Sequence, residues 1–150
     1  MEIFIKTFQE INTKELYAIL QLRSEVFVVE QKCVYQDIDG NDEKALHVIG
    51  IEKNKIVAYT RCFKSGDYFD QASIGRVVVR KDQRGKGFAH QIMERSIKAI
   101  TDVFNSKTMK VSAQTYLKDF YETHGFFQKG GEYLEDGIPH IAMILNEDRD

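Results

Sequence analysis

Residues 74–104 constrain the fold of this chain more than any other stretch, because they join a strand to an amphipathic helix through a short basic turn. Residues 77–79 are three consecutive valines, and β-branched side chains favour strands. Across residues 89–104, apolar side chains recur three or four positions apart. That spacing is typical of a helix with one buried face. We therefore expect a strand and a long helix that pack together, with a tight turn between them.

The turn before this helix is predicted to bind a phosphate. The first N–H groups of a helix have no partner inside the helix and lie at the positive end of its dipole. Gly85 and Gly87 allow an anion to approach that backbone without meeting a Cβ atom. The natural ligand is a phosphate or, better, a pyrophosphate. Basic side chains surround the turn: Arg80, Lys81, Arg84 and Lys86.

Spacing decides which class of phosphate site the turn resembles. A nucleotide-binding P-loop continues with serine or threonine after its Gly-Lys pair, whereas Lys86 is followed by Gly87. A dinucleotide fingerprint requires glycine or alanine three positions after its second glycine, and His90 occupies that position. The turn does contain Arg84-x-x-Gly87-x-Ala89. This pattern resembles the acetyl-coenzyme A motif of the GNAT superfamily of N-acetyltransferases, Gln/Arg-x-x-Gly-x-Gly/Ala.

A second segment and the order of the elements carry the same resemblance. Residues 120–126 read Phe-Tyr-Glu-Thr-His-Gly-Phe and are similar to the GNAT helix that ends in a tyrosine and a Gly-Phe pair. The resemblance spans essentially the whole chain and implies one GNAT domain over residues 1–150. Its fold class is α/β (α+β), with a mixed sheet of about six to seven strands, a parallel splayed pair and about four flanking helices. We expect strands at 3–8, 46–51, 56–63, 73–79, 109–114, 126–128, 132–134 and 138–145, and helices at 13–27, 89–104 and 116–124.

Four further segments are similar to the ElaA-like subgroup of this family: residues 23–31, 37–42, 113–114 and 135–140. The resemblance implies a transferase that moves the acetyl group of acetyl-coenzyme A (acetyl-CoA) to a primary amine by direct attack in a ternary complex. It leaves the acceptor open between a small molecule, a peptide and a protein. GNAT proteins are often homodimers, which makes a second copy of the chain a candidate partner.

The resemblance also implies which residues hold the coenzyme. Backbone groups of Val77 and Val79 would bond the pantetheine arm, and a backbone N–H at Val78 or Val77 would meet the thioester oxygen. Many GNAT proteins place an asparagine that touches the pantetheine seven residues before the tyrosine, and Gln114 occupies that position here. The pyrophosphate would lie on the turn formed by Arg84, Gly85, Lys86, Gly87, Phe88 and Ala89.

Tyr121 matches the family's tyrosine that protonates the departing thiolate. A phenol can donate a proton to a thiolate of similar or lower basicity when water is excluded. Taken alone, Tyr121 beside Phe120 would be interpreted as a core aromatic; the Gly-Phe ending and the upstream motif favour the catalytic role. The general base stays open among four side chains: Glu30, His47, Asp136 and His140.

Two charged regions outside the turn have alternative interpretations. Arg23 and Glu30 lie close to the apolar stripe of the first expected helix, where they either snorkel at its margin or face a substrate groove. Residues 35–42 are acidic but lack the spacing of an EF-hand, so we expect a plain exposed loop. The cysteines and histidines show no close paired spacing of the zinc type, and we expect no metal site.

Composition limits the remaining functions. The chain has 150 residues, of which 43% are hydrophobic and 29% charged, and a net charge of -2. These values indicate one soluble domain without a general attraction to nucleic acid. No apolar run has the length of a signal peptide or a membrane span, so we expect a cytoplasmic protein with Cys33 and Cys62 as reduced thiols. A non-catalytic acyl-CoA sensor is the alternative to an enzyme; a nucleic-acid binder is more remote, because only Phe88 is available for stacking.

Overall fold

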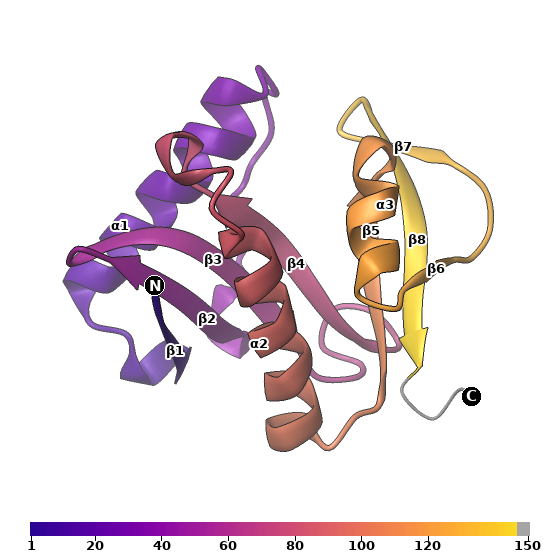
Figure 1. Ribbon diagram of the computed structural model, residues 1–150, viewed down its shortest axis with the longest axis horizontal. Coiled ribbons are helices and arrows are strands. Elements are labelled where there is room, and N and C mark those ends of the chain that lie inside the picture. The colour runs from indigo at the N-terminus through magenta and orange to yellow at the C-terminus, as the bar shows by residue number, and fades with distance from the viewer. Residues whose placement is uncertain (147–150) are drawn as a thin grey trace.

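One mixed β-sheet of eight strands runs through the molecule, and helices cover both of its faces (Figure 1). The computed structural model describes residues 1–146. The strand order is β1-β2-β3-β4-β5-β8-β6, and β7 pairs with β8. The strands are β1 Glu2–Thr7, β2 Leu46–Glu52, β3 Lys55–Phe63, β4 Ala72–Val79, β5 Thr108–Gln114, β6 Phe127–Gln128, β7 Tyr133–Glu135 and β8 Ile138–Asn146. The helices are α1 Thr13–Arg23, α2 Phe88–Phe104 and α3 Lys118–Thr123, and the π-helical segment η2 Ser24–Glu30 continues α1.

Each strand and helix expected from the sequence is present, but the totals differ slightly. The sheet has eight strands rather than the expected total of six to seven. All of the expected ranges form separate strands, and the short β6 and β7 both pair with β8. Residues 1–146 contain three α-helices rather than about four, since the chain between η2 and β2 forms a loop with one short turn of 3₁₀-helix. Within the same residues, no helix combines the length and the apolar character needed to cross a bilayer.

The first helix begins at a reciprocal cap. The Asn12 side chain accepts a hydrogen bond from the backbone N–H of Glu15 at 2.8 Å, and the Glu15 carboxylate accepts one from the backbone N–H of Asn12 at 3.0 Å. These bonds satisfy donors that the start of a helix leaves unpaired. Lys6 of β1 also donates to Glu15, at 2.7 Å. The start of α1 is therefore fixed to the first strand.

Two apolar cores lie on opposite faces of the sheet. On one face α2 packs through side chains such as Ile92 and Ile100, and α3 contributes Tyr121. On the other face α1 packs through Ile19 and Leu22. Fully burying an aliphatic side chain contributes roughly 1.5–3 kcal/mol. The sheet is therefore held from both sides, with α2 and α3 on one face and α1 with η2 on the other (Figure 1).

The parallel strands β4 and β5 separate after a short contact. Ala72 pairs with Met109 and Ser73 with Lys110, and no further pair joins these two strands. The separation is visible as a wedge between them in Figure 1. Unpaired strand edges accept extended ligands by adding a strand to the sheet. The wedge therefore exposes backbone groups in the middle of the sheet.

A bulge in β4 accompanies this separation. The register of β4 against β3 shifts between Tyr59 and Arg61, and Arg76 has a positive φ of 50°. Residues other than glycine seldom adopt this conformation, and bulges often redirect a side chain beside a functional site. Here the side chain of Arg76 reaches Asp37, to which its Nε donates at 2.7 Å.

An ionic network anchors the loop between η2 and β2 to the sheet. Arg23 donates to Asp37 at 2.9 Å and to Asp42 at 2.7 Å. Arg61 of β3 donates to Asp42 at 3.0 Å and to Asp39 at 2.6 Å. Paired carboxylates and guanidinium groups tolerate burial because each charge has a hydrogen-bonded partner. The full network consists of Arg23, Arg61, Arg76, Asp37, Asp39 and Asp42.

Two predictions about this region were wrong. Residues 35–42 do not form a plain exposed loop, because Asp37 and Asp42 are buried. Arg23 neither snorkels at the margin of α1 nor faces a groove, because the residue is 0% exposed and its donors are taken by the network. The physical reason in both cases is the same: the acidic loop is neutralised by arginines that stand on α1, β3 and β4.

Candidate active site

The turn between β4 and α2 presents an unpaired stretch of backbone. Gly85 and Gly87 both have a φ of 80°, and a Cβ atom at either position would meet nothing within 4 Å. In the described part of the chain, the N–H groups from Gly85 to His90 donate to no carbonyl and to no side chain. They lie at the positive end of the longest helix. Such a cradle fits a phosphate or diphosphate.

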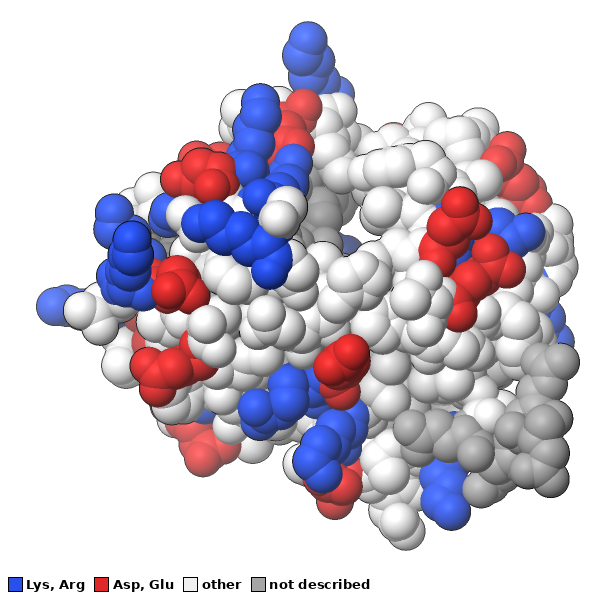
Figure 2. Space-filling view, viewed as in Figure 1, with Lys and Arg blue, Asp and Glu red and all other residues white. Residues whose placement is uncertain are grey.

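Basic side chains surround this turn, and one of them is paired with an acid. Figure 2 shows Lys and Arg gathered over the turn, beside a hollow in the surface. Lys86 donates to Gln83 at 3.0 Å. Arg84 donates through Nε to the carbonyl oxygen of Val79 at 3.0 Å, and its two terminal nitrogens donate to Glu30 at 2.6 and 2.9 Å. These bonds lower the pKa of Glu30. Glu30 therefore lies beside the turn and is not among the residues that line the cavity described below.

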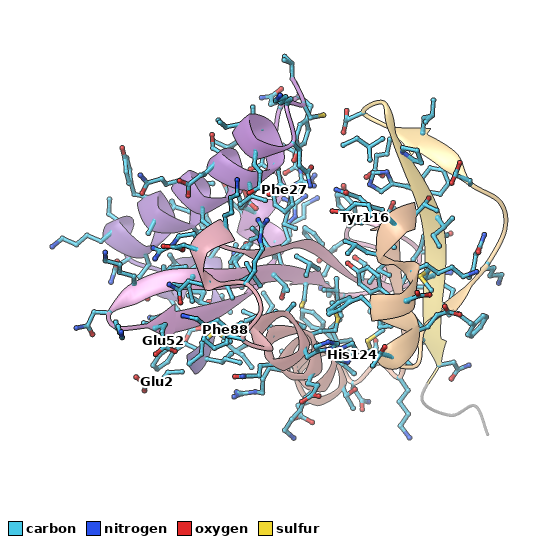
Figure 3. The ribbon with its side chains drawn as sticks, turned by 45° about the horizontal axis from the view of Figure 1, so that its top comes forward. Glu2, Phe27, Glu52, Phe88, Tyr116 and His124 are labelled. Atoms are coloured by element: carbon cyan, nitrogen blue, oxygen red, sulfur yellow. The ribbon has the colours of Figure 1, made fainter. Side chains whose placement is uncertain are left out.

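A cavity of about 120 Å³ opens where β4 and β5 separate. One water needs roughly 10–15 Å³ of such volume, so the cavity has room for a small organic group. We call this cavity the cup. Phe27 of η2 and the following loop form one wall, and residues of β7 and β8 form the other. Figure 3 shows Phe27, on η2, across from Tyr116, which precedes α3.

Small and polar residues form the floor of the cup. Alternate residues of a strand point to the same face, so Ser73 and Gly75 of β4 share a face, as do Ser112 and Gln114 of β5. All four line the cup. A Cβ atom at Gly75 would meet nothing within 4 Å. The missing side chain at Gly75 therefore helps to hollow this part of the sheet.

Tyr121 reaches the cup from the opposite face of the sheet. The residue is 5% exposed and belongs to the core around α2 and α3, where its ring contacts Phe126 edge-on at a centroid distance of 5.9 Å. It also lines the cup. Burial raises the pKa of Tyr121, so the phenol keeps its proton. Tyr121 is thus a packed core aromatic that keeps its phenolic proton and also lines the cup.

Gln114 lies at the end of β5, opposite His140 in the register with β8. Its Nε2 lies 3.3 Å from Oε1 of Gln31, which follows η2. Both glutamines line the cup. The amide of Gln114 therefore lies at the cup, and its contact with the pantetheine stays a prediction.

His140 and Glu135 form a pair on the wall of the cup. Nδ1 of His140 lies 2.7 Å from the carbonyl oxygen of Ile138, and because a carbonyl can only accept, Nδ1 carries the proton. Nε2 lies 3.3 Å from Oε2 of Glu135. The other carboxylate oxygen accepts a hydrogen bond from Ser112 at 3.1 Å. The imidazole of His140 and the carboxylate of Glu135 therefore lie together on the wall of the cup.

His47 is a structural histidine. It is fully buried, with Nδ1 2.6 Å from the Tyr59 hydroxyl and Nε2 3.0 Å from the carbonyl oxygen of Asp42. Nε2 therefore carries the proton, and Nδ1 accepts from Tyr59. Burial lowers the pKa of His47. Both ring nitrogens are occupied away from the cup, so His47 is not placed to act as a base.

Asp136 lines the cup from the turn between β7 and β8. Its φ is 51°, and its carbonyl oxygen lies 3.4 Å from Sγ of Cys33. This contact joins the loop after η2 to the β7–β8 turn. Cys33 and Cys62 are both free, buried thiols, and burial raises the pKa of Cys62 to about 12.

The sequence interpretation missed several residues of the cup. Gly75 carried one local signal, because an isolated glycine inside a strand often marks a close approach. Glu135 lay inside one of the ElaA-like segments, but nothing local separated it from its neighbours. Arg61 and Ser73 carried no signal, because both face the cup only once β3, β4 and β5 are assembled.

Known proteins resemble this chain over most of its length. A profile of the acetyltransferase (GNAT) domain matches residues 9–147. The chain belongs to the GNAT acetyltransferase family. Protein ElaA of Escherichia coli strain K12 is 43% identical over 136 residues, which cover 89% of each chain. A UPF0039 protein of Schizosaccharomyces pombe is 40% identical over 147 residues, or 97% of each chain. The resemblance of this GNAT protein to the ElaA-like subgroup is therefore confirmed.

Solved structures agree on the fold of this GNAT domain. An acyl-CoA N-acyltransferase from Pseudomonas aeruginosa has a TM-score of 0.90 at 39% identity, over 97% of this chain and 99% of that chain. The crystal structure of Escherichia coli ElaA has the same TM-score, identity and coverage. The predicted GNAT fold with its parallel, splayed strand pair is confirmed.

Proposed function

We propose that this GNAT protein transfers the acetyl group of acetyl-CoA to a primary amine. The observation that carries the proposal is the unpaired backbone from Gly85 to His90, which lies next to the wedge that leads into the cup. These N–H groups, together with Lys86, suit the diphosphate of a coenzyme. The edge of β4 at Val77 and Val79, which is not paired with β5, suits the amides of a pantetheine arm, although the Val79 carbonyl oxygen already accepts a hydrogen bond from Arg84. The cytoplasm would supply acetyl-CoA.

The chemistry requires a base, a carbonyl donor and an acid. The amine nitrogen attacks the thioester carbonyl, so that a C–N bond forms and the C–S bond breaks. Nε2 of His140, backed by Glu135, takes the proton of the amine directly or through one water. A backbone N–H at Val77 or Val78 would donate to the thioester oxygen. Tyr121 gives its proton to the thiolate, and the proton held by His140 returns to Tyr121 through solvent. Holding both reactants in place supplies most of the acceleration.

The experiment that tests the coenzyme site is a calorimetric titration with acetyl-CoA. Wild-type protein is expected to bind, and Gly87→Glu is expected to abolish binding, because a carboxylate side chain would occupy the cradle. Gly130→Glu is the matched control, since Gly130 has a φ of 85° and equally open surroundings but lies on a distant loop. Equal affinity in both variants would place the diphosphate elsewhere.

A second assay separates an enzyme from a non-catalytic acyl-CoA sensor on the same fold. Free thiol release is followed with a panel of primary amines in the presence of acetyl-CoA. Amine-dependent release supports the transferase. Tight binding of acetyl-CoA without release for any amine would favour the sensor.

A further inference from the structure

Two residues that line the cup each carry a buried donor without a partner. Ser73 is 2% exposed and Arg61 is 0% exposed, and both residues line the cup. Oγ of Ser73 and Nε of Arg61 have no hydrogen-bond partner among the described residues. The other nitrogens of Arg61 are already held by Asp39 and Asp42. A buried donor without a partner is costly, so these two atoms indicate a ligand group that accepts hydrogen bonds.

Opposite charges lie near the two ends of the cup. At the Ser73 end, Lys110 is the β5 partner of Ser73, and its Nζ lies 4.1 Å from the ring centroid of Phe69, which lines the cup. Lys110 has no carboxylate partner within residues 1–146. At the other end are the carboxylates of Glu135 and Asp136. The arginines and aspartates of the ionic network balance each other, so Lys110 sets the sign of the charge near Ser73.

We propose that the acceptor is a small zwitterion, with its amine at the Glu135–His140 end and a carboxylate bound by Ser73 and Arg61. The inference rests on the proposed function, because it names the substrate class of the same site. A carboxylate accepts from both orphan donors at once and is attracted by Lys110. The acidic end attracts the ammonium form of the amine, which loses one proton to solvent there; the neutral amine then attacks beside the proposed base, which takes the second proton.

The length of β4 sets the separation of the two charges. Ser73 lies four residues before Val77, where the thioester is expected, and four residues of strand span about 13 Å. From this length we subtract about 3 Å for the contact of the carboxylate with Ser73, about 3 Å for the approach of the amine to the thioester, and the shortening by the bulge. Roughly 5–7 Å then remain between the amine nitrogen and the carboxylate oxygen of the acceptor. An extended chain covers roughly 1.2 Å per bond. Acceptors with about five or six bonds between these atoms, such as 4-aminobutyrate and 5-aminopentanoate, therefore fit best.

The test compares amines with and without a carboxylate. Thiol release is measured with glycine, 4-aminobutyrate, 5-aminopentanoate and 8-aminooctanoate, and with butylamine and pentylamine as matched controls. We expect kcat/KM for 4-aminobutyrate or 5-aminopentanoate to exceed that of the plain amine of equal length by about tenfold or more. We expect glycine and 8-aminooctanoate to be poorer. Equal kcat/KM for carboxylated and plain amines would overturn the inference and leave the transferase intact.

Substitution of Ser73 tests the donor itself. Ser73→Ala is expected to lower kcat/KM for 4-aminobutyrate about tenfold more than it lowers kcat/KM for butylamine. Because Oγ of Ser73 has no partner, the urea midpoint of this variant should not fall. Ser96→Ala is the matched control, because the Ser96 hydroxyl is bonded to Thr60 at 2.6 Å and to Ile92 at 2.7 Å; its midpoint should fall. A lower midpoint in Ser73→Ala would reveal a structural partner and overturn the inference.

A binding measurement keeps the inference separate from the proposed function. If no amine releases thiol, 4-aminobutyrate is titrated into protein saturated with coenzyme A. Binding that Ser73→Ala weakens would support the zwitterion site even though transfer had failed. Binding that is absent in the wild type, or equal in both proteins, would overturn it.

Discussion

The guanidinium of Arg84 forms two hydrogen bonds with the carboxylate of Glu30, at 2.6 and 2.9 Å. Arg84 stands on the turn that is proposed to hold the coenzyme diphosphate, and Glu30 ends η2. The pair therefore joins the segment that walls the cup to the turn. It also places a negative charge beside the proposed anion site.

Removing that charge should strengthen coenzyme binding. Glu30→Gln frees Arg84 for the diphosphate and removes a repulsion, so we expect the Kd for acetyl-CoA to fall about two- to tenfold, in the range of an exposed ion pair. The gain should shrink at high salt, because exposed charges are screened. Calorimetry at two ionic strengths measures both effects. Glu25→Gln, an exposed η2 position, is the control; weaker binding in Glu30→Gln alone would mean that the pair positions the turn.

Tyr121→Phe should separate chemistry from binding. Loss of the phenolic proton donor is expected to lower kcat by roughly ten- to a thousandfold, the range of a lost general acid. The Kd for acetyl-CoA should not change, because the ring that packs in the core is retained. Single-turnover kinetics and calorimetry give the two values. Tyr116→Phe, at an exposed position before α3, should leave both unchanged. Equal turnover in wild type and Tyr121→Phe would remove this residue from the mechanism.

His140→Gln should slow proton removal from the amine. We expect kcat/KM to fall about a hundredfold and the pH–rate profile to lose the limb that reflects the imidazole. Glu135→Gln should also lower kcat/KM, but by a smaller factor, because the imidazolium of His140 then lacks its counter-ion. Measurements of kcat/KM between acidic and alkaline pH test both variants. A profile with the same limbs in His140→Gln would assign the base to another group.

Asp42→Asn should destabilise the fold. Asp42 accepts from both Arg23 and Arg61, and breaking a buried ion pair on one side costs about 3–5 kcal/mol. Burial acts to raise the pKa of Asp42, but the hydrogen bonds from these arginines hold it below its ordinary value of 3.8. The unfolded state therefore binds the proton more tightly, so this stabilisation is present above about pH 4 and is lost as the pH falls further.

Urea denaturation at pH 7 and near pH 3 checks this expectation. The difference in unfolding free energy between wild type and Asp42→Asn should be largest at pH 7 and smaller near pH 3. Glu43→Gln is the matched control, because Glu43 is the exposed neighbour in the same short turn. A difference that does not depend on pH would mean that the carboxylate contributes through shape rather than charge.

The sequence predicted those parts of the molecule whose partners are local. The cap of α1 depends on Asn12 and Glu15, three residues apart, and α2 follows from the spacing of its own apolar residues. The open turn before α2 was equally accessible, because its unpaired N–H groups belong to one continuous stretch at the start of a helix; that it binds an anion stays a prediction. In each case, one short window of sequence contains the whole interaction.

The cup and the ionic network were not predictable in the same way. Arg23 meets Asp37 and Asp42 from 14 and 19 residues away, and Arg61 meets Asp39 from 22 residues away. The charge pattern shows that an acidic loop exists but not which cations neutralise it. The floor of the cup depends likewise on the register of β3, β4 and β5, and a shift of one residue would turn its side chains to the opposite face.

The wedge between β4 and β5 leaves a free strand edge inside the sheet rather than at its rim. Such an edge is a template for strands of other chains and promotes aggregation unless something covers it. A bound pantetheine arm would cover it from within. The coenzyme would then act as a folding partner as well as a reactant, and the protein should be most prone to self-association when the cellular pool of coenzyme A is depleted.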